Sequence, residues 1–316
     1  MKLYKYVIPD RVDILTGLRL RFTQAAEFND PFEVLPNIAA VMPPEKEDAF
    51  YSQFEDEAAR MWEEELPKVF AANGMTLEQA DELLRELGID KPAREILTPP
   101  DIGARTIAAA KAIIPKLLEH ARPTLGRDIQ ERFGARWGIL SLSDTPTNLL
   151  MWAHYADSHR GFAVELDGLS EFFHRGSPPS VVGHPIAVTY ARDRPALTMY
   201  TPEPTREFFD DAIRGALLTK SVDWSYEREY RVIFPLDDPD TYPHEVVSGR
   251  FHLFPIPPDA ITGVVIGARA SEDVHVAIRT ALSANSHLSH VTVRKAEISL
   301  DKYAVDIKDE SLSAAS

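Results

Sequence analysis

A turn near the N-terminus carries the first residues that could do chemistry. Residues 28–33 read Phe-Asn-Asp-Pro-Phe-Glu. Asn and Asp are typical of turns, and a proline disfavours a helical residue before it. The segment is expected to form a turn in which Asn29 and Asp30 cap the local backbone between two aromatic anchors. The alternative is that Asn29 or Asp30 faces a pocket and orients a ligand.

A second set of residues joins the end of an expected strand to a short helix. Ser141 and Ser143 alternate with leucine, and residues 152–155 read Trp-Ala-His-Tyr. Large aromatic rings beside hydroxyls and an imidazole would suit a site that stacks a flat ring and fixes its orientation by polar contacts. The other interpretation places Trp152 and Tyr155 in the core, with His154 hydrogen-bonded locally.

A third set lies late in the chain, where Lys220 and Trp224 precede residues 226–231, Tyr-Glu-Arg-Glu-Tyr-Arg. In a strand, Glu227, Glu229 and Arg231 would point to one face. The pattern is either an exposed edge face with an ion pair, or a pair of carboxylates. In the second case one carboxylate would be tuned as an acid, a base or a transition-state stabiliser.

The sequence contains none of the common cofactor or metal motifs. It has no cysteine, no Walker loop, no Gly-x-Gly-x-x-Gly, no Gly-x-Ser-x-Gly and no His-Glu-x-x-His. Disulfides, thiolate metal sites and thiol nucleophiles are therefore excluded, and no metal site is expected.

The chain of 316 residues is acidic, with a formal net charge of -15. An acidic surface argues against nonspecific binding to nucleic acid or anionic membranes. However, residues 45–90 hold 14 acidic and 4 basic residues, so two-thirds of the net charge lies in this segment. A nucleotide-like small molecule, or even a nucleic acid, near the remaining residues therefore stays open. The acidic segment could dock a basic protein partner.

The elements expected from the sequence position these three sets. Strands are expected at residues 3–8, 18–22, 137–143, 162–166, 186–190, 230–235, 262–266, 291–295 and 303–307. Helices are expected at residues 47–72, 76–88, 102–121 with a kink at Pro115, 147–159, 205–220 and 271–284. The strands gather in two groups instead of alternating with helices, which predicts an α+β fold with a mixed or antiparallel core.

The same elements suggest the division into domains. Residues 1–42 and 131–308 are expected to form the α+β core, residues 43–130 an acidic helical insertion or cap, and residues 309–316 a frayed tail. No apolar run is long enough to span a bilayer, and residues 1–6 do not resemble a signal peptide. No membrane association and a cytoplasmic location are the resulting expectations. The oligomeric state is open.

The three sets occur together in the bacterial family DUF2971 (domain of unknown function 2971), which the chain resembles. The matching segments are residues 3–6, 21–23, 27–33, 140–143, 150–157, 161–162, 188–190 and 226–231, with Lys220 and Trp224. The acidic stretch near residues 45–95 falls outside the resemblance. Relatives of this family occur among phage-defence and toxin-like genes, which implies a role of that type.

The order of the sets is also similar in outline to ADP-ribosyltransferases, which use NAD. In that resemblance Lys5 or Tyr6 on the first strand would bind the cofactor ribose, Ser141 and Ser143 would be the middle hydroxyls, and Trp152 or Tyr155 would stack on nicotinamide. Glu227 or Glu229 would stabilise the oxocarbenium-like transition state. Asn29, Asp30 and Arg231 complete the expected cofactor-binding set, and His154 joins the two glutamates as a candidate catalytic residue.

The transferase resemblance implies two small perpendicular sheets on which Lys5, the Ser141 strand and Glu229 converge at one cleft. Two other interpretations stay open. Asp30, His154, Glu227 and Glu229 could surround a divalent ion in a hydrolase or nuclease. Alternatively, the chain is a non-catalytic interaction or sensor module, in which the same residues form core contacts and a structural ion pair.

Overall fold

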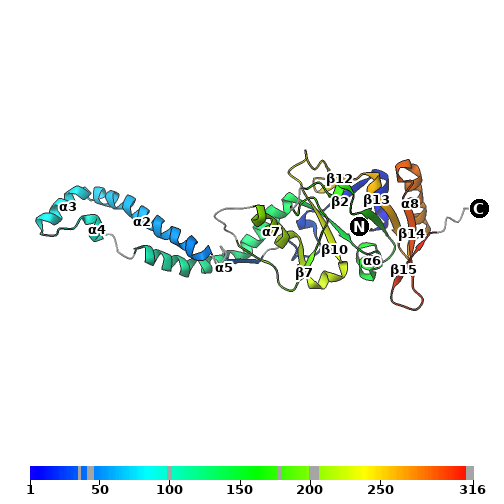
Figure 1. Cartoon of the computed structure of the whole chain (residues 1–316), viewed down its shortest axis with the longest axis horizontal. Coiled ribbons are helices and arrows are strands. Elements are labelled where there is room, and N and C mark those ends of the chain that lie inside the picture. Colours follow the sequence, from blue (N-terminus) through cyan, green and yellow to red (C-terminus); the bar gives the residue numbers. More distant parts are fainter. Residues whose placement is uncertain (35–36, 41–45, 98–101, 177–179, 199–205, 311–316) are drawn as a thin grey trace, which may run out of the picture. The chain divides into compact units, whose positions relative to one another are not determined.

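The structure is a computed structural model of the 316-residue chain, and it describes residues 1–34, 37–40, 46–97, 102–176, 180–198 and 206–310 (Figure 1). Its contacts divide the chain into two compact units, which we call the sheet unit and the helical unit. The sheet unit comprises Met1–Asn37, Gly126–Pro195 and Pro204–Ser316, and the helical unit comprises Ile38–Leu125 and Ala196–Glu203.

An eight-stranded sheet organises the sheet unit, in the order β15-β14-β13-β5-β1-β4-β10-β6. Its strands are β1 (Lys2–Val7), β4 (Trp137–Ser143), β5 (Phe162–Asp167), β6 (Ile186–Ala187), β10 (Glu229–Pro235), β13 (Ile261–Ile266), β14 (Thr292–Ile298) and β15 (Val305–Asp309). Only β13 and β14 run parallel among these pairs. The sheet is therefore mixed, and the expected α+β class fits the structure.

Smaller sheets and short helices complete the sheet unit. β2 (Arg19–Phe22) pairs with β12 (Phe251–Pro255), which pairs with β11 (Glu245–Val247), and β7 (Thr189–Ala191) runs parallel to β9 (Thr219–Ser221). The helices are α1 (Asp13–Gly17), α6 (Leu149–Tyr155), α7 (Arg206–Leu217) and α8 (Glu272–Ala284). The 3₁₀ helices include η2 (Ala25–Glu27) and η5 (Val222–Glu227).

Aromatic packing fixes the large sheet to the smaller one. The ring of Phe22 on β2 lies 4.7 Å from that of Phe234 on β10 and 4.5 Å from that of Phe254 on β12, centroid to centroid. All three side chains are fully buried. Such large buried rings contribute much of the core stability, so β10 is held in a rigid frame.

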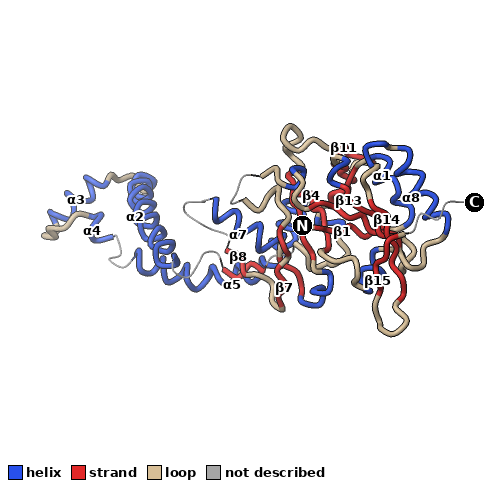
Figure 2. Tube along the Cα trace, turned by 45° about the vertical axis from the view of Figure 1, so that its right-hand side comes forward, coloured by secondary structure: helices blue, strands red, loops and turns tan. Residues whose placement is uncertain are grey.

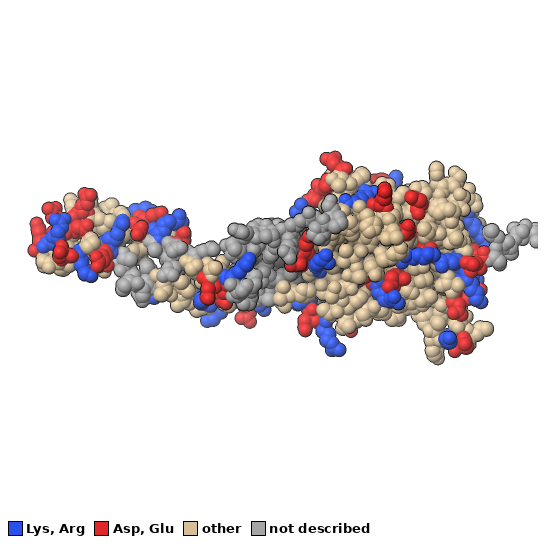
Figure 3. All heavy atoms as spheres, in the orientation of Figure 1, with Lys and Arg blue, Asp and Glu red and all other residues tan. Residues whose placement is uncertain are grey.

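The helical unit consists of α2 (Glu47–Ala72), α3 (Leu77–Glu86), α4 (Ala93–Leu97) and most of α5 (Ile102–Arg136), with β3 (Asn37–Ala40) paired to β8 (Ala196–Thr198) (Figure 2). The expected capping box of α3 is present, since Thr76 and Gln79 bond each other's backbone N–H. Acidic and basic side chains are interspersed over α2 and α3 (Figure 3).

Two expected helix ends are wrong. α5 does not stop at residue 121 but continues to Arg136 with Pro115 and Pro123 inside it. α6 begins after Asn148, whose side chain accepts the N–H groups of Leu150 and Met151, and it ends at Tyr155. It cannot reach residue 159, because residues 157–159 all have positive φ, which no helix accommodates.

The expected tail at residues 309–316 is corrected at its start. Asp309 belongs to β15, and the Glu310 carboxylate accepts hydrogen bonds from His275 and Arg279 on α8 at 2.7 and 2.8 Å. Residues 311–316 lie outside the described residues, as do the expected helix start at Thr205 and residues 43–45 of the expected insertion. Among the helices of the described residues, we find none with the length and apolar character needed to cross a bilayer.

Candidate functional site

Segments from across the sequence line one cavity of about 290 Å³ in the sheet unit, which we call the first cavity. Its walls come from β1, β4, α6, the turn at residues 28–33 and the start of β10. The strand register explains this convergence, because Ser143 on β4 lies opposite Tyr4 on one side and Glu229 on the other. Cross-strand neighbours approach to about 5 Å, so segments distant in sequence meet here.

Glu227 occupies the end of η5 and is buried. Arg228 follows with φ of 47°, a left-handed conformation that ends the turn before β10 begins. The Glu227 backbone oxygen accepts the Ser143 hydroxyl at 2.8 Å. Its Oε1 accepts the Tyr155 hydroxyl at 2.6 Å, and its Oε2 accepts Lys220 Nζ at 2.7 Å. Burial raises the pKa of Glu227 in spite of the Lys220 charge.

Glu229, two residues later, is paired far more completely. Its Oε1 accepts Arg231 Nε at 2.8 Å, and its Oε2 accepts Arg231 Nη2 at 3.2 Å and Lys220 Nζ at 3.4 Å. Burial alone would raise the pKa of Glu229, but the charges of Arg231 and Lys220 outweigh it and lower the pKa to about 2. Glu229 is thus a fixed anion.

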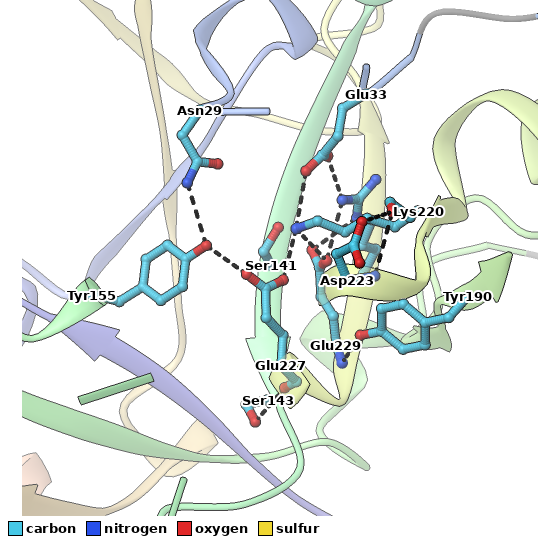
Figure 4. A network of polar contacts seen from close by, with 12 residues as sticks. Asn29, Glu33, Ser141, Ser143, Tyr155, Tyr190, Lys220, Asp223, Glu227 and Glu229 are labelled. Carbon is cyan, nitrogen blue, oxygen red and sulfur yellow. Dashed lines mark hydrogen bonds and ion pairs between the residues drawn. The ribbon is translucent and has the colours of Figure 1, made fainter. Parts of the chain in front are cut away.

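Lys220 and Arg231 are the two cations of a buried cluster with Glu33, Glu227 and Glu229. Figure 4 shows Lys220 among the three glutamates. Lys220 Nζ lies 3.0 Å from Glu33 Oε1, and Arg231 Nη2 donates to Glu33 Oε2. Arg231 Nη1 donates to the Leu217 carbonyl at 2.7 Å. Burial opposes the charge of Lys220, yet the three carboxylates raise its pKa. With all groups ionised, the cluster has one negative charge in excess.

Two further cations, Lys5 and Arg21, also line the first cavity. Lys5 Nζ donates to the Ser141 carbonyl at 2.9 Å, and burial lowers the pKa of Lys5 to about 8 in spite of the attraction of Glu229. Arg21 reaches Glu27 through a long contact of 3.3 Å, and its Nε is buried without a partner among the described residues. The first cavity is therefore lined by both cations and carboxylates, including Glu27 beside Arg21.

Most of the residues expected to bind a ligand meet in this cavity. Lys5, Tyr6, Asn29, Ser141, Ser143, Tyr155, Glu227 and Glu229 all line it. The Asn29 amide approaches the Tyr155 hydroxyl at 3.5 Å, which extends the chain of contacts from Glu227 towards the surface (Figure 4). The Tyr6 hydroxyl donates to the Thr145 carbonyl at 2.7 Å, so its proton is already used within the protein.

Four of the residues expected in the site do not line the first cavity. Trp152 is fully buried, donates to the Pro146 carbonyl at 2.8 Å and packs edge-on against Tyr6, so it belongs to the core. His154 is exposed, because α6 turns Met151 and Tyr155 inwards and Leu150 and His154 outwards.

The other two are Asp30 and Arg231. Asp30 lines a different cavity, and its Oδ1 accepts the Phe32 N–H at 2.9 Å. Arg231 is 1% exposed and does not line the first cavity, since its guanidinium is enclosed by Glu33, Glu229 and Leu217. It can set the charge of Glu229 but cannot itself touch a ligand.

Three important residues were not among those expected from the sequence to form the site. Glu33 and Lys220 hold the buried cluster, and Arg21 supplies positive charge to the first cavity. Glu33 and Lys220 stand in the same motifs as Asp30 and Glu227. Two acidic residues as close as Glu227 and Glu229 need cationic partners if they are buried. This requirement could have pointed to Lys220 as a residue of the site.

The carboxylates are not arranged for a divalent ion. Among the described residues no group of three or more His, Asp or Glu is placed to hold a metal. The oxygens of Glu33 and Glu229 already accept donors from Lys220 and Arg231, so a metal ion would have to displace both cations.

Comparison with known proteins supplies a family but no activity. Searches of curated proteins and of solved structures gave no significant match to the chain. A family model described as "Protein of unknown function (DUF2971)" matches residues 151–232, the segment that holds Tyr155, Lys220, Glu227 and Glu229. This match supports the resemblance to the DUF2971 family over residues 151–232.

Proposed function

We propose that the protein is an NAD-using enzyme of the ADP-ribosyltransferase type, in which Glu227 faces the reacting ribose. The observation that carries the proposal is the first cavity, where Lys5, Ser141 and Glu227 meet from three separate elements. β1, β4 and β10 are consecutive neighbours in the eight-stranded sheet. This differs from the two small sheets expected of a transferase, but it supplies the convergence on one cleft that the chemistry needs.

The charged residues that line the first cavity support a ligand that carries both negative and positive groups. Lys5 and Arg21 would attract phosphate oxygens, which are recognised by cationic donors. The excess negative charge around Glu227 would attract the positive nicotinamide ring and the ribose that develops positive charge. At about 290 Å³ the cavity is at the small end of ligand sites, which suits the nicotinamide riboside part of NAD better than the whole dinucleotide.

Glu227 is a better candidate than Glu229 for stabilising the reaction. Glu229 shares its charge with Arg231 and Lys220, whereas Glu227 has one cationic partner and one neutral partner, Tyr155. In the reaction, the bond between ribose C1′ and the nicotinamide nitrogen breaks, and its electron pair leaves with nicotinamide. A carboxylate beside C1′ stabilises the resulting positive charge until a nucleophile, either water or an acceptor, adds and loses its proton.

The test is the release of nicotinamide from NAD, followed by chromatography with the purified full chain. Wild-type protein should release nicotinamide or transfer radiolabelled ADP-ribose. Glu227→Gln should lower the rate by about 100- to 1,000-fold, the usual loss for a removed electrostatic stabiliser. Glu119→Gln, an exposed residue of α5, is the matched control and should leave the rate unchanged.

The proposal is lost if NAD causes no shift in melting temperature and no turnover. A rate that disappears with chelator and returns with magnesium or manganese would favour the metal-dependent hydrolase. Stable capture of a basic protein by the acidic residues 45–90, with no response to NAD, would favour the interaction module.

A further inference from the structure

A second cavity, of about 440 Å³, lies in the sheet unit next to the first. Glu33 and Lys220 line both cavities, so the buried ion pair between them is a shared wall. The other walls of the second cavity come from Asp30, residues 191–195, the end of α7 and β9. Nothing in the proposed reaction uses this space.

Asp30 gives the second cavity an incompletely paired buried charge. Its side chain is 5% exposed, and its Oδ1 accepts the Phe32 N–H at 2.9 Å. Its Oδ2 has no hydrogen-bond donor among the residues that the structure describes, and no described Lys or Arg lies within 4.0 Å of the carboxylate. A buried carboxylate is costly unless a positive charge or several donors compensate it.

The other charged groups around the second cavity are engaged or peripheral. Lys220 is held by Glu33, Glu227 and Glu229, and Glu33 is also bonded to Arg231. Residues 192–194, Arg-Asp-Arg, are exposed at the rim. Inside the cavity, Asp30 therefore offers an open anionic oxygen among small side chains such as Ala191 and Ala216.

We propose that the second cavity is a binding site for an organic cation, a primary ammonium or a guanidinium group, which pairs with the open oxygen of Asp30. A single carboxylate with one open oxygen satisfies such a group through charge-assisted hydrogen bonds. It does not satisfy a metal ion, and no set of three metal-binding side chains was found among the described residues. The proposal does not depend on NAD use in the first cavity.

The shared wall gives the bound cation a second effect. Positive charge beside Glu33 competes with Lys220 for that carboxylate and pushes the Lys220 ammonium towards Glu227 and Glu229. Lys220 Nζ lies 4.8 Å from the centre of the Trp224 ring, so its displacement changes the surroundings of the indole. Occupancy of the second cavity should therefore alter Trp224 fluorescence, and by linkage a ligand of the first cavity should change the affinity for the cation.

Isothermal titration of the full chain with ethylguanidinium chloride tests the site directly. Saturable binding is expected for the wild type, and sodium propionate, an anion of similar size, should not bind. Asp30→Asn keeps the acceptor for the Phe32 N–H but removes the charge, and it should weaken the cation's binding about tenfold. Asp259→Asn, an exposed carboxylate that lines neither cavity, is the matched control and should change the affinity less than about twofold.

Two further variants keep the test decisive if Asp30→Asn folds poorly. Ala191→Leu fills the second cavity without removing a polar group, and it should abolish binding. Trp224→Phe should remove the fluorescence change while the heat of binding persists. No saturable binding to the wild type, or unchanged binding by Ala191→Leu, would overturn the site. A fluorescence change that survives Trp224→Phe would overturn the shared wall.

Discussion

Two buried glutamates of the same sheet unit, Glu165 and Glu227, differ in how completely their oxygens are used. The Glu165 carboxylate on β5 accepts hydrogen bonds from the Tyr4 hydroxyl at 3.0 Å and the Thr262 hydroxyl at 2.9 Å. It also pairs with Lys2 Nζ at 2.9 Å and accepts a hydrogen bond from Arg294. Glu227 accepts only the Tyr155 hydroxyl and Lys220 among the described residues, and it lines the first cavity.

The pKa shifts of the two carboxyls follow this difference. Burial would raise both, but the donors around Glu165 lower its pKa, whereas the pKa of Glu227 is raised. A carboxylate with four donors is a cross-link between strands and has no capacity left for a ligand. A carboxylate with two donors beside a cavity keeps lone pairs for an additional partner. The two glutamates are similarly buried, so the number of their donors, not burial, is what distinguishes them.

The largest effect should come from breaking each cluster at its cation. Arg231→Met leaves Glu33 and Glu229 buried with one cation between them and should lower the free energy of unfolding by about 3–5 kcal/mol. Arg294→Met leaves Glu165 with three donors and should cost about 1–2 kcal/mol. Urea unfolding of both variants measures the difference. Equal losses would contradict the view that Arg231 anchors a denser charge cluster.

A smaller effect is expected from the neutral partner of Glu227. The Tyr155 hydroxyl stabilises the Glu227 carboxylate, so Tyr155→Phe should raise the pKa of Glu227 further. If the ionised form acts on NAD, the acidic limb of the rate profile should move to higher pH. The rate near pH 7 should fall about tenfold, the worth of one charge-assisted hydrogen bond.

Recovery of that rate at alkaline pH distinguishes this mechanism from lost packing. Tyr242→Phe is the control, since Tyr242 packs against Phe234 in the core and does not line the first cavity. A uniform loss at all pH values in Tyr155→Phe would show that Tyr155 acts by contact and not through Glu227.

The smallest effect concerns Lys5, which lines the first cavity. Lys5, with a pKa lowered to about 8, is charged at pH 7 and mostly neutral at pH 9. Affinity for an anionic ligand should therefore fall as the pH rises, by about fivefold for NAD over this interval. Lys5→Arg stays charged throughout and should abolish the pH dependence in titration calorimetry. The same fall in Lys5→Arg and wild type would remove Lys5 from ligand binding.

The sequence predicted those elements best whose bounds depend on local patterns. The strand at residues 137–143 has the expected bounds, and the capping box at Thr76 opens α3 as expected. The ends of α5 and α6 were predicted wrongly. The prolines inside α5 suggest breaks that do not occur, and the sequence gives no clear sign of the three positive φ values that follow α6.

The sequence predicted how site residues are placed only where they share one face of a single strand. Glu229 and Arg231 share a face of β10, but Glu227 belongs to the preceding 3₁₀ helix. Trp152 and His154 do not line the first cavity, and a seven-residue helix is too short for its sequence to show which face is buried. The meeting of Lys5 with Glu229 depends on the order β1-β4-β10, a non-local property that no short motif contains.

One paired measurement tests the central claim, that Glu227 is a functional carboxylate and Glu165 a structural one. Glu227→Gln and Glu165→Gln are compared for nicotinamide release by folded protein and for the free energy of unfolding. We predict that Glu227→Gln lowers the rate of nicotinamide release at least about 100-fold. Its free energy of unfolding should change little, because Lys220 still forms ion pairs with Glu33 and Glu229. Glu165→Gln should lose about 1–3 kcal/mol of stability with the rate retained. Equal rates in the two variants, or a rate loss confined to Glu165→Gln, would contradict the account.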